Sequence, residues 1–466
     1  MKRIMKFKRL RFLVLVLALM VFSSTVTFAA PNENSSTAFD KKVLARIDAE
    51  RALKHIENLS EGIGPRIAGT KEERQAAEYV KRELNRYGYD AEIQEFDIKN
   101  VIPKLTIDSL NNKELKSNAA TGSGNTGENG VTANIINCGL GLDSSNFPEE
   151  VKGNIALIQR GAISFSDKAI NAVAAGAVGV ILYNNVDGIL NPTLGTYVSP
   201  IPVLAISKAD GDLLANEVAD KEIQATIKAP LYTKSWNVIA KREPKNKNKA
   251  TDKIIYVTAH YDSVPYAPGA NDNASGTAML LEFARILKAY PIDKEVRFIA
   301  CGAEEIGLLG SRYYVSKLSE DELSRSFANF NMDMIATSYE ACNILYADTV
   351  TGEPNLVTDY AVAAGARLGN NILSISPGSS SDHAPFGDLG IPAACFIWGD
   401  ENGKLEPWYH TPDDTINTNL SLDRLQQAGE IVGSALYDAL RVQTPNLKNT
   451  PVKINTNKHY DFGVTQ

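Results

Sequence analysis

Five residues in the second half of the chain carry side chains that bind metal ions well. They are His260, Asp272, Glu305, Asp333 and His410, in the segments TAHYDSVPYAPGANDN, FIACGAEEIG, NFNMDMI and PWYHTPDDT. Zinc binds imidazole nitrogen and carboxylate oxygen readily, and catalytic zinc sites leave a position open for water. Five such ligands divide naturally into one shared carboxylate and two ligands for each of two ions. The set therefore predicts two Zn²⁺ ions and metal-assisted hydrolysis.

Two more carboxylates stand next to these candidate ligands. Glu304 directly precedes Glu305 and is not one of the five candidate ligands. We expect Glu304 to be the general base, which takes a proton from a zinc-bridging water and passes it to the leaving amine. Asp262 follows His260 by two residues, where its carboxylate can orient the imidazole ring.

Most of these side chains lie at or just after the ends of three predicted strands. His260 follows IIYVTA (254–259), Glu304 and Glu305 follow VRFIAC (296–301), and Asp333 ends NFNMD. Unbroken apolar runs are typical of strands that are covered on both faces. Because ligands of an open α/β sheet gather beyond the carboxyl ends of its strands, we expect the side chains to share one edge.

Each of these residues also has a simpler interpretation. A histidine at a strand end is often structural, two adjacent glutamates are often solvated, and an aspartate before a helix is often a cap. His383 in SSSDHAPF competes as a metal ligand, although we favour a structural or pocket-lining role. His55 and His459 have no acidic or strand-end context, and we expect them to be structural or on the surface.

The elements that must position these residues alternate between strands and helices from Ser235 onward. Helices are predicted at 274–289, 309–317, 354–368 and 421–441, and AACFIW is a further strand. Nearer the N-terminus, helices are predicted at 39–58 and 71–87, a loop at 59–70 and a strand at 91–96. Thr70 is the expected cap of the second helix, and Gly88 ends it. The alternation predicts an α/β fold with a mixed, mostly parallel sheet and helices on both faces.

Residues 100–231 form a separate unit without any metal-ligand cluster. Its segment 118–134, rich in Gly, Asn, Ser and Thr, predicts a long loop. GNIALIQRG, Phe165, Lys168, AAGA and VILYNN resemble a protease-associated (PA) domain, a small α+β insert of several peptidases. The resemblance implies a lid or substrate-access role without catalysis. An unrelated α+β insert is the alternative.

The first 30 residues have the pattern of a secretory signal peptide. Six basic residues and no acidic ones precede the apolar run FLVLVLALMVF, whose 11 residues are too short for a membrane span. Small residues follow, and cleavage is expected near Ala29 or Ala30. An uncleaved anchor is the alternative. The sequence thus predicts a secreted, extracellular protein with no membrane contact after cleavage.

The charge of the remaining chain and its cysteines agree with this prediction. The formal net charge is −7, and removing six of the 48 basic residues makes it −13. An acidic surface argues against nucleic acid and anionic membranes as partners. Cys301 and Cys395 lie in apolar runs, so we expect core thiols, and without any CxxC spacing a cysteine zinc site is not expected.

The motifs HYDSVPYAPGANDNASG, GAEEIGLLGS, NMDM, SDHAPF and WYHTPDDT occur in this order. Together they closely resemble the M28 family of metallopeptidases, in particular secreted bacterial aminopeptidases of the leucyl/arginyl type with a PA insert. The resemblance implies a zinc-peptidase fold of the phosphorylase/hydrolase-like class, with the peptidase at 31–99 and 232–445 and a tail at 446–466. It implies a monomeric, zinc-dependent aminopeptidase that acts on peptides with a free N-terminus.

The resemblance also implies a role for each site residue. His260 and Asp333 would bind one zinc, Glu305 and His410 the other, and Asp272 would bridge them. Glu304 matches the general base, Asp262 the acid behind the histidine, and Tyr409 the tyrosine that stabilises the tetrahedral intermediate. The Asp272–Asn273 peptide bond matches one that is cis in relatives. Some relatives carry a basic residue before SDH where this chain has Ser379, Ser380 and Ser381, which puts a substrate contact there in doubt.

Three other functions use related folds. A carboxypeptidase of the same fold shares the ligand set, but it needs cationic side chains for the substrate carboxylate, and no arginine cluster accompanies these motifs. A one-zinc cyclase of the acyltransferase type lacks the full ligand set, which this chain has. A non-catalytic binding protein with a PA domain lacks zinc ligands, whereas all five and the base are present here.

Overall fold

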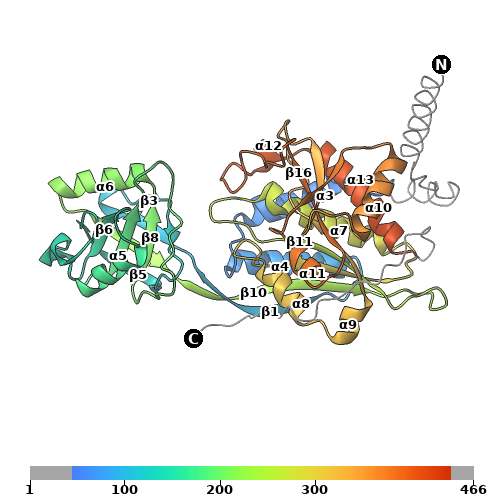
Figure 1. The fold of residues 1–466 in the computed structure, drawn as a ribbon, viewed down its shortest axis with the longest axis horizontal. Coiled ribbons are helices and arrows are strands. Elements are labelled where there is room, and N and C mark those ends of the chain that lie inside the picture. The colour runs from blue at the N-terminus through green and yellow to red at the C-terminus, as the bar shows by residue number, and fades with distance from the viewer. Residues whose placement is uncertain (1–44, 442–466) are drawn as a thin grey trace, which may run out of the picture.

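Two eight-stranded sheets organise the chain, in a computed structural model that describes residues 45–441. Figure 1 shows them as two bodies joined by a two-stranded ribbon. The ribbon consists of β1 (Glu92–Val101) and β10 (Leu231–Arg242), which pair in antiparallel fashion. The signal peptide predicted at 1–30 and the tail predicted at 446–466 lie outside the described residues.

The larger sheet has the strand order β1-β10-β12-β11-β13-β16-β14-β15. Its other strands are β11 (Ile254–His260), β12 (Glu295–Cys301), β13 (Ser326–Met332), β14 (Ile344–Thr349), β15 (Leu373–Pro377) and β16 (Ala393–Gly399). The four central strands β12, β11, β13 and β16 run parallel, and β10 and β14 flank them in antiparallel fashion. The sheet is therefore mixed and mostly parallel, as the sequence predicts.

Helices cover both faces of this sheet, which is also as predicted (Figure 1). Side chains alternate along a strand, so Ile255 and Val257 of β11 enter one core and Ile254 and Tyr256 enter the other. The first core is closed by α3 (Ala49–Ile56), α4 (Lys71–Arg86), α7 (Gly276–Leu287), α10 (Leu356–Leu368) and α13 (Leu422–Ala439). The second is closed by α8 (Leu309–Ser316), α9 (Glu320–Arg325) and α11 (Ala384–Asp388).

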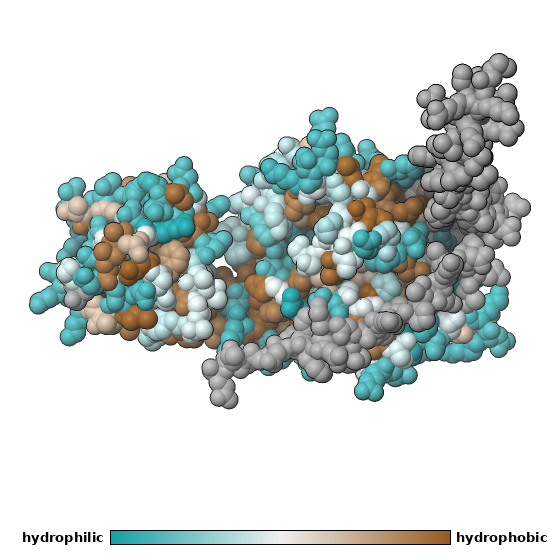
Figure 2. Space-filling model, viewed as in Figure 1, coloured by the Kyte–Doolittle hydropathy of each residue, from teal (hydrophilic) through white to brown (hydrophobic). Residues whose placement is uncertain are grey.

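The smaller sheet has the order β3-β2-β9-β5-β6-β7-β8-β4. Its strands are β2 (Lys104–Ile107), β3 (Lys113–Leu115), β4 (Asn118–Ala119), β5 (Gly127–Asn137), β6 (Ile155–Gln159), β7 (Gly179–Tyr183), β8 (Val203–Ile206) and β9 (Gln224–Ala229). Helices α5 (Phe165–Ala174) and α6 (Lys208–Asp220) pack against it. Figure 2 shows a notch between this body and the larger one in the same view.

The loop predicted at 118–134 is wrong at both ends, because Asn118–Ala119 form β4 and β5 begins at Gly127. This strand pairs with β9, with Thr132 opposite Thr226 and their hydroxyls 2.8 Å apart. A Cβ at Gly130 would lie 2.7 Å from the Ile227 carbonyl oxygen, so the glycine permits a close strand approach. Pairing with a neighbouring strand has overridden the loop-like composition.

The elements near the N-terminus differ in detail from the prediction. In the described residues α3 begins at Ala49, where Asp48 accepts a hydrogen bond from Arg51 N, and it continues as a π-helical turn (Glu57–Ile63). The loop predicted from residue 59 therefore begins at Gly64. Thr70 caps α4 as expected, and the positive φ of Gly88 follows the end of that helix.

Two general predictions can be compared with the described residues. All four cysteines are buried and unpaired, which confirms that Cys301 and Cys395 are core thiols. Among the helices between residues 45 and 441, none combines the length and apolar character that a membrane crossing requires.

Candidate metal centre

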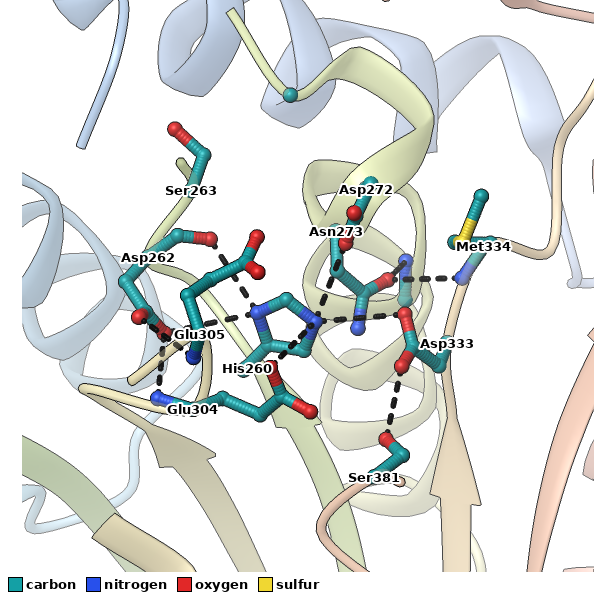
Figure 3. Close-up of polar contacts among 12 residues, drawn as sticks. His260, Asp262, Ser263, Asp272, Asn273, Glu304, Glu305, Asp333, Met334 and Ser381 are labelled. Carbon is teal, nitrogen blue, oxygen red and sulfur yellow. Dashed lines mark hydrogen bonds and ion pairs between the residues drawn. The ribbon is translucent and has the colours of Figure 1, made fainter. Parts of the chain in front are cut away.

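The five candidate ligands lie together beyond the carboxyl ends of the central strands. Figure 3 shows four of them, His260, Asp272, Glu305 and Asp333. His260 is the last residue of β11, and Asp333 directly follows β13. Glu305 lies in the turn after β12. Because β12 runs parallel to β11 with His260 opposite Cys301, this turn is at the same edge of the sheet as His260. Asp272 lies at a kink with non-helical backbone angles within the turn Ala270–Ser275, just before α7. His410 lies in the loop before α12 (Ile416–Asn419).

Asp272 lies between the two imidazole rings. One carboxylate oxygen, Oδ1, is 3.3 Å from His260 Nε2, and the other, Oδ2, is 3.2 Å from His410 Nε2. Each histidine also faces a carboxylate of its own. His260 Nε2 is 3.3 Å from Asp333 Oδ1, and His410 Nε2 is 3.1 Å from Glu305 Oε2. The cluster thus consists of two halves that share one carboxylate.

The donor set fits divalent cations. Ligand atoms of His260, Glu304 and Asp333 lie within 4.8 Å of one another, and so do those of His260, Asp272 and Glu305. His410 is outside these two sets, but its short contacts to Asp272 and Glu305 extend the second one. Glu305 Oε1 is buried and accepts no hydrogen bond within the described residues. Buried charges of one sign require paired charges or a metal ion.

The acids and imidazoles of this cluster shift the pKa values of one another strongly. Burial raises the pKa of Glu304 well above its ordinary value, and the neighbouring carboxylates Glu305 and Asp333 add to the effect. Burial lowers the pKa of His260, but Glu304 and Asp333 outweigh it and raise that pKa on balance. The pKa of His410 rises to about 10, since Asp272 and Glu305 outweigh its burial. Such clustered shifts are typical of functional sites.

Asp262 supports both Glu304 and Glu305 as well as His260. Its Oδ1 accepts the backbone N–H of Glu304 at 3.1 Å, and its Oδ2 accepts that of Glu305 at 3.2 Å. His260 Nδ1 lies 3.2 Å from the Asp262 carbonyl oxygen and 3.5 Å from its carboxylate. The residue expected to orient one imidazole therefore also fixes the turn that carries the two glutamates.

Asn273 and Asp414, the second of which was not expected from the sequence, fix the backbone around Asp272. The two oxygens of Asp414 accept the backbone N–H groups of Asn271 and Asp272, both at 3.0 Å. Asn273 donates to the Met332 carbonyl at 2.9 Å, which ties this turn to the end of β13. The Asp272–Asn273 peptide bond is cis. The position of Asp414 in WYHTPDDT, four residues after a candidate ligand, is the one signal for it in the sequence.

The three serines before Asp382 differ in their surroundings. Ser379 and Ser380 are exposed, whereas Ser381 is buried and donates to Asp333 Oδ2 at 2.8 Å. Asn331 in turn donates to Ser381 Oγ at 2.8 Å. Ser381 therefore occupies one oxygen of Asp333 and leaves the other toward His260.

The remaining candidates lie as follows. Tyr409 is 40% exposed, and its ring stacks on His410 with 3.7 Å between ring centroids. His383 Nε2 contacts the Gly378 carbonyl at 2.9 Å, outside both ligand sets, which agrees with the structural role favoured for it. His55 is buried between the hydroxyls of Tyr79 and Tyr87. His459 lies outside the described residues.

Comparisons with known families agree with both bodies of the structure. The model of Peptidase family M28 matches residues 237–436, which contain all the candidate site residues. The PA domain model matches residues 124–214 in the smaller body.

Individual relatives give the same result. Aminopeptidase YwaD of Bacillus subtilis (strain 168) is 47% identical over 396 residues, which cover 84% of this chain and 85% of the relative. Leucine aminopeptidase 2 of Arthroderma otae is 34% identical over 295 residues, or 61% of this chain and 57% of the relative.

Two solved structures are also similar. BSAP, a zinc aminopeptidase from Bacillus subtilis, has 44% identity and a TM-score of 0.68, covering 88% of this chain and 98% of that one. An aminopeptidase from Aneurinibacillus sp. strain AM-1 has 41% identity and a TM-score of 0.61, covering 86% and 96%.

Proposed function

Because the chain belongs to peptidase family M28 and is a zinc aminopeptidase with a PA domain, we propose that it works with two zinc ions. His260 and Asp333 bind one ion, Glu305 and His410 bind the other, and Asp272 bridges them. The observation that carries this proposal is the position of Asp272, whose two oxygens face the two imidazoles at 3.3 and 3.2 Å. A carboxylate in that position serves two ions at once.

The chemistry divides between the metal ions and the chain. The zinc ions, when bound, polarise the scissile carbonyl and lower the pKa of water. Glu304 accepts a proton from the attacking water and delivers it to the leaving amine. Its side chain is 8% exposed and its backbone N–H donates to Asp262, so the main chain that carries the carboxylate is fixed in place. The raised pKa of Glu304 supports a role in holding and releasing a proton.

Tyr409 is proposed to stabilise the negative charge that develops on the carbonyl oxygen. Its ring stacks on His410, next to the proposed ligands, and its partial exposure leaves it accessible to a peptide. A hydroxyl donor positioned beside developing negative charge is a common source of catalysis.

The surroundings of the site favour recognition of a substrate amine over a substrate carboxylate. Buried carboxylates surround the proposed metals. Arg66, a cation close to this group of acids, is fully buried and donates to backbone carbonyls. It is therefore not available to bind the C-terminus of a peptide. This supports peptides with a free N-terminus as substrates.

Metal analysis and one substitution test the proposal. The purified enzyme should contain two zinc ions per chain and hydrolyse an amino-acid anilide. Glu304→Gln should keep both ions and lose turnover, since the amide cannot take up the proton. Full activity in this variant would refute the assigned base, and one zinc per chain would refute the shared site.

We further propose the organisation of the whole chain. Residues 100–231 are the PA insert, and 31–99 together with 232–445 form the peptidase. Residues 1–30 direct secretion and are removed near Ala29 or Ala30, and the mature enzyme is a monomer. N-terminal sequencing of enzyme recovered from culture medium, with sedimentation analysis, tests these points. Cell-associated enzyme that begins at Met1 would contradict secretion, and a sedimentation mass of two chains would contradict the monomer.

A further inference from the structure

Arg66 is fully buried. Within the described residues, every hydrogen bond that its guanidinium donates goes to a main-chain carbonyl oxygen. Arg66 lies in the segment GPRIAGT, between the π-helical turn Glu57–Ile63 and α4. The carbonyl groups that accept its side-chain hydrogen bonds are those of Leu59, Gly64, Tyr261, Pro268 and Gly269. A planar guanidinium with five N–H donors suits such a ring of acceptors.

Three of these acceptors belong to one loop, residues 261–271, which joins His260 to Asp272. Arg66 Nε donates to Tyr261 at 2.6 Å, next to His260 in the chain. Its Nη2 donates to Gly269 at 3.0 Å, three residues before Asp272. The side chain therefore holds both ends of the loop that connects two proposed zinc ligands.

The backbone of Arg66 adds two contacts near the start of the loop. Its N–H donates to Ser263 Oγ at 3.0 Å, and its carbonyl accepts the N–H of Ser263 at 3.2 Å. Ser263 Oγ donates onward to the Ala267 carbonyl at 3.1 Å. Figure 3 shows Ser263 just beyond Asp262 in this loop.

Gly269 shows how closely the guanidinium fits. A Cβ at this position would lie 2.7 Å from Arg66 Nη2 and 2.3 Å from the Asp272 carbonyl oxygen. The φ of Gly269 is +63°, a conformation that favours glycine. The loop is therefore shaped around the arginine.

The buried guanidinium also carries charge into an acidic region. Burial lowers the pKa of Arg66 to about 10, while the carboxylates of Asp262, Asp414, Asp272 and Glu305 oppose that shift. The side chain therefore stays cationic at neutral pH, close to the carboxylates of the proposed site.

We propose that Arg66 is a positioning residue of the metal centre, which sets the spacing of His260 and Asp272 by holding the loop between them from inside. The inference rests on the proposed two-zinc function. Lysine cannot replace Arg66, because an ammonium is a point donor with three hydrogens and cannot reach acceptors at both ends of the loop. Substitution should therefore weaken zinc binding and lower kcat, with little change in KM, since Arg66 does not touch substrate.

The test compares Arg66→Lys with Arg242→Lys. Arg242 is a matched control, because its buried guanidinium also donates to main-chain carbonyls, those of Leu287 and Tyr290, away from the metal centre. Zinc is removed from each purified enzyme with a chelator and Zn²⁺ is titrated back. The absorption spectrum of the Co²⁺-loaded enzyme, the melting temperature, kcat and KM are measured alongside.

Arg66→Lys is expected to bind Zn²⁺ about tenfold or more weakly, to lose at least a similar factor in kcat, and to show an altered Co²⁺ spectrum. Arg242→Lys is expected to lower the melting temperature and leave the other properties unchanged. Equal zinc affinity, spectrum and kcat in Arg66→Lys and wild type would overturn the proposal, and so would equal losses in the two variants.

Two further results keep the test decisive. If Arg66→Lys does not fold, Ser263→Ala takes its place. It removes the hydroxyl that accepts the Arg66 backbone N–H, which is the other hold of Arg66 on this loop, and should shift zinc affinity in the same direction by a smaller factor. Wild-type zinc affinity in that variant would then overturn the proposal. A wild-type enzyme that takes up fewer than two Zn²⁺ would instead refute the proposed two-zinc function.

Discussion

Asp414 accepts the backbone N–H of Asp272 at 3.0 Å, so the loop that carries His410 also holds the carboxylate proposed to bridge the two ions. The other oxygen of Asp414 takes the N–H of Asn271 at the same distance. Asn419 donates to Asp414 and also to the buried Glu406, which Asn271 contacts as well. The turn that contains Asp272 and the loop that contains His410 are thus connected by Asp414 and Glu406, two carboxylates that are not proposed to bind metal.

Asp414→Asn is expected to weaken zinc binding and lower kcat. The amide has one acceptor oxygen instead of two, so either Asn271 N–H or Asp272 N–H loses its partner and the turn relaxes. Loss of supporting contacts around ligands typically costs about 10–100-fold in metal affinity or activity. Zinc titration with steady-state kinetics checks the prediction, and Asp413→Asn, at an exposed neighbouring site, is the control. Equal zinc affinity in the two variants would contradict it.

Ser381→Ala is expected to weaken metal binding in the half of the site that contains His260 and Asp333. The hydroxyl donates to Asp333 Oδ2 at 2.8 Å inside the protein, and alanine leaves that oxygen without its donor. Loss of a hydrogen bond that orients a metal ligand typically costs about tenfold or more in metal affinity. Zinc titration measures the change, and the exposed Ser380→Ala should bind zinc as wild type does.

His55 is expected to make the fold less stable in mild acid. Its ring nitrogens lie 2.7 Å from the Tyr79 hydroxyl and 3.0 Å from that of Tyr87, and burial lowers its pKa to about 4. The unfolded chain, with an ordinary pKa of about 6.5, therefore binds a proton that the folded chain does not. The stability from neutral His55 is present above about pH 6.5 and is lost as the pH falls toward 4.

The size of this effect follows from the shift in pKa. It amounts to about 3 kcal/mol across that range. Denaturant unfolding at several pH values measures it, with His55→Gln as the comparison, because glutamine does not titrate there. If wild type and His55→Gln lose stability in parallel between pH 6.5 and 4, the assignment to His55 is wrong.

The sequence predicted the proposed ligands better than it predicted their supports. His260 and Asp333 stand at the ends of apolar strands, a local pattern that a single sequence reveals. Arg66 and Ser381 come from segments far from their partners along the chain, and nothing in their neighbours indicates a contact with residue 261 or 333. Such contacts depend on how the elements pack, and packing also turned the glycine-rich start of β5 into a strand.

Asp262 offers the sharpest test of how one carboxylate supports catalysis. It accepts hydrogen bonds from the backbone N–H groups of both Glu304 and Glu305. It therefore positions the proposed base and one proposed ligand together. Asp262→Asn places an amide where two N–H donors need two acceptors, and one N–H loses its partner. We expect kcat to fall by about 10–100-fold while KM changes little, since Asp262 does not touch substrate.

A double-mutant cycle separates the two routes by which Asp262 acts. If it acts mainly through Glu304, then adding Asp262→Asn to Glu304→Gln should lower the residual kcat by much less than it does in wild type, because the base is already absent. If it acts mainly through Glu305 and His260, the double variant should bind zinc more weakly than Glu304→Gln. Additive losses in kcat at full zinc occupancy would show that the two residues act independently, and would contradict the hydrogen bond from Glu304 N–H as the link between them.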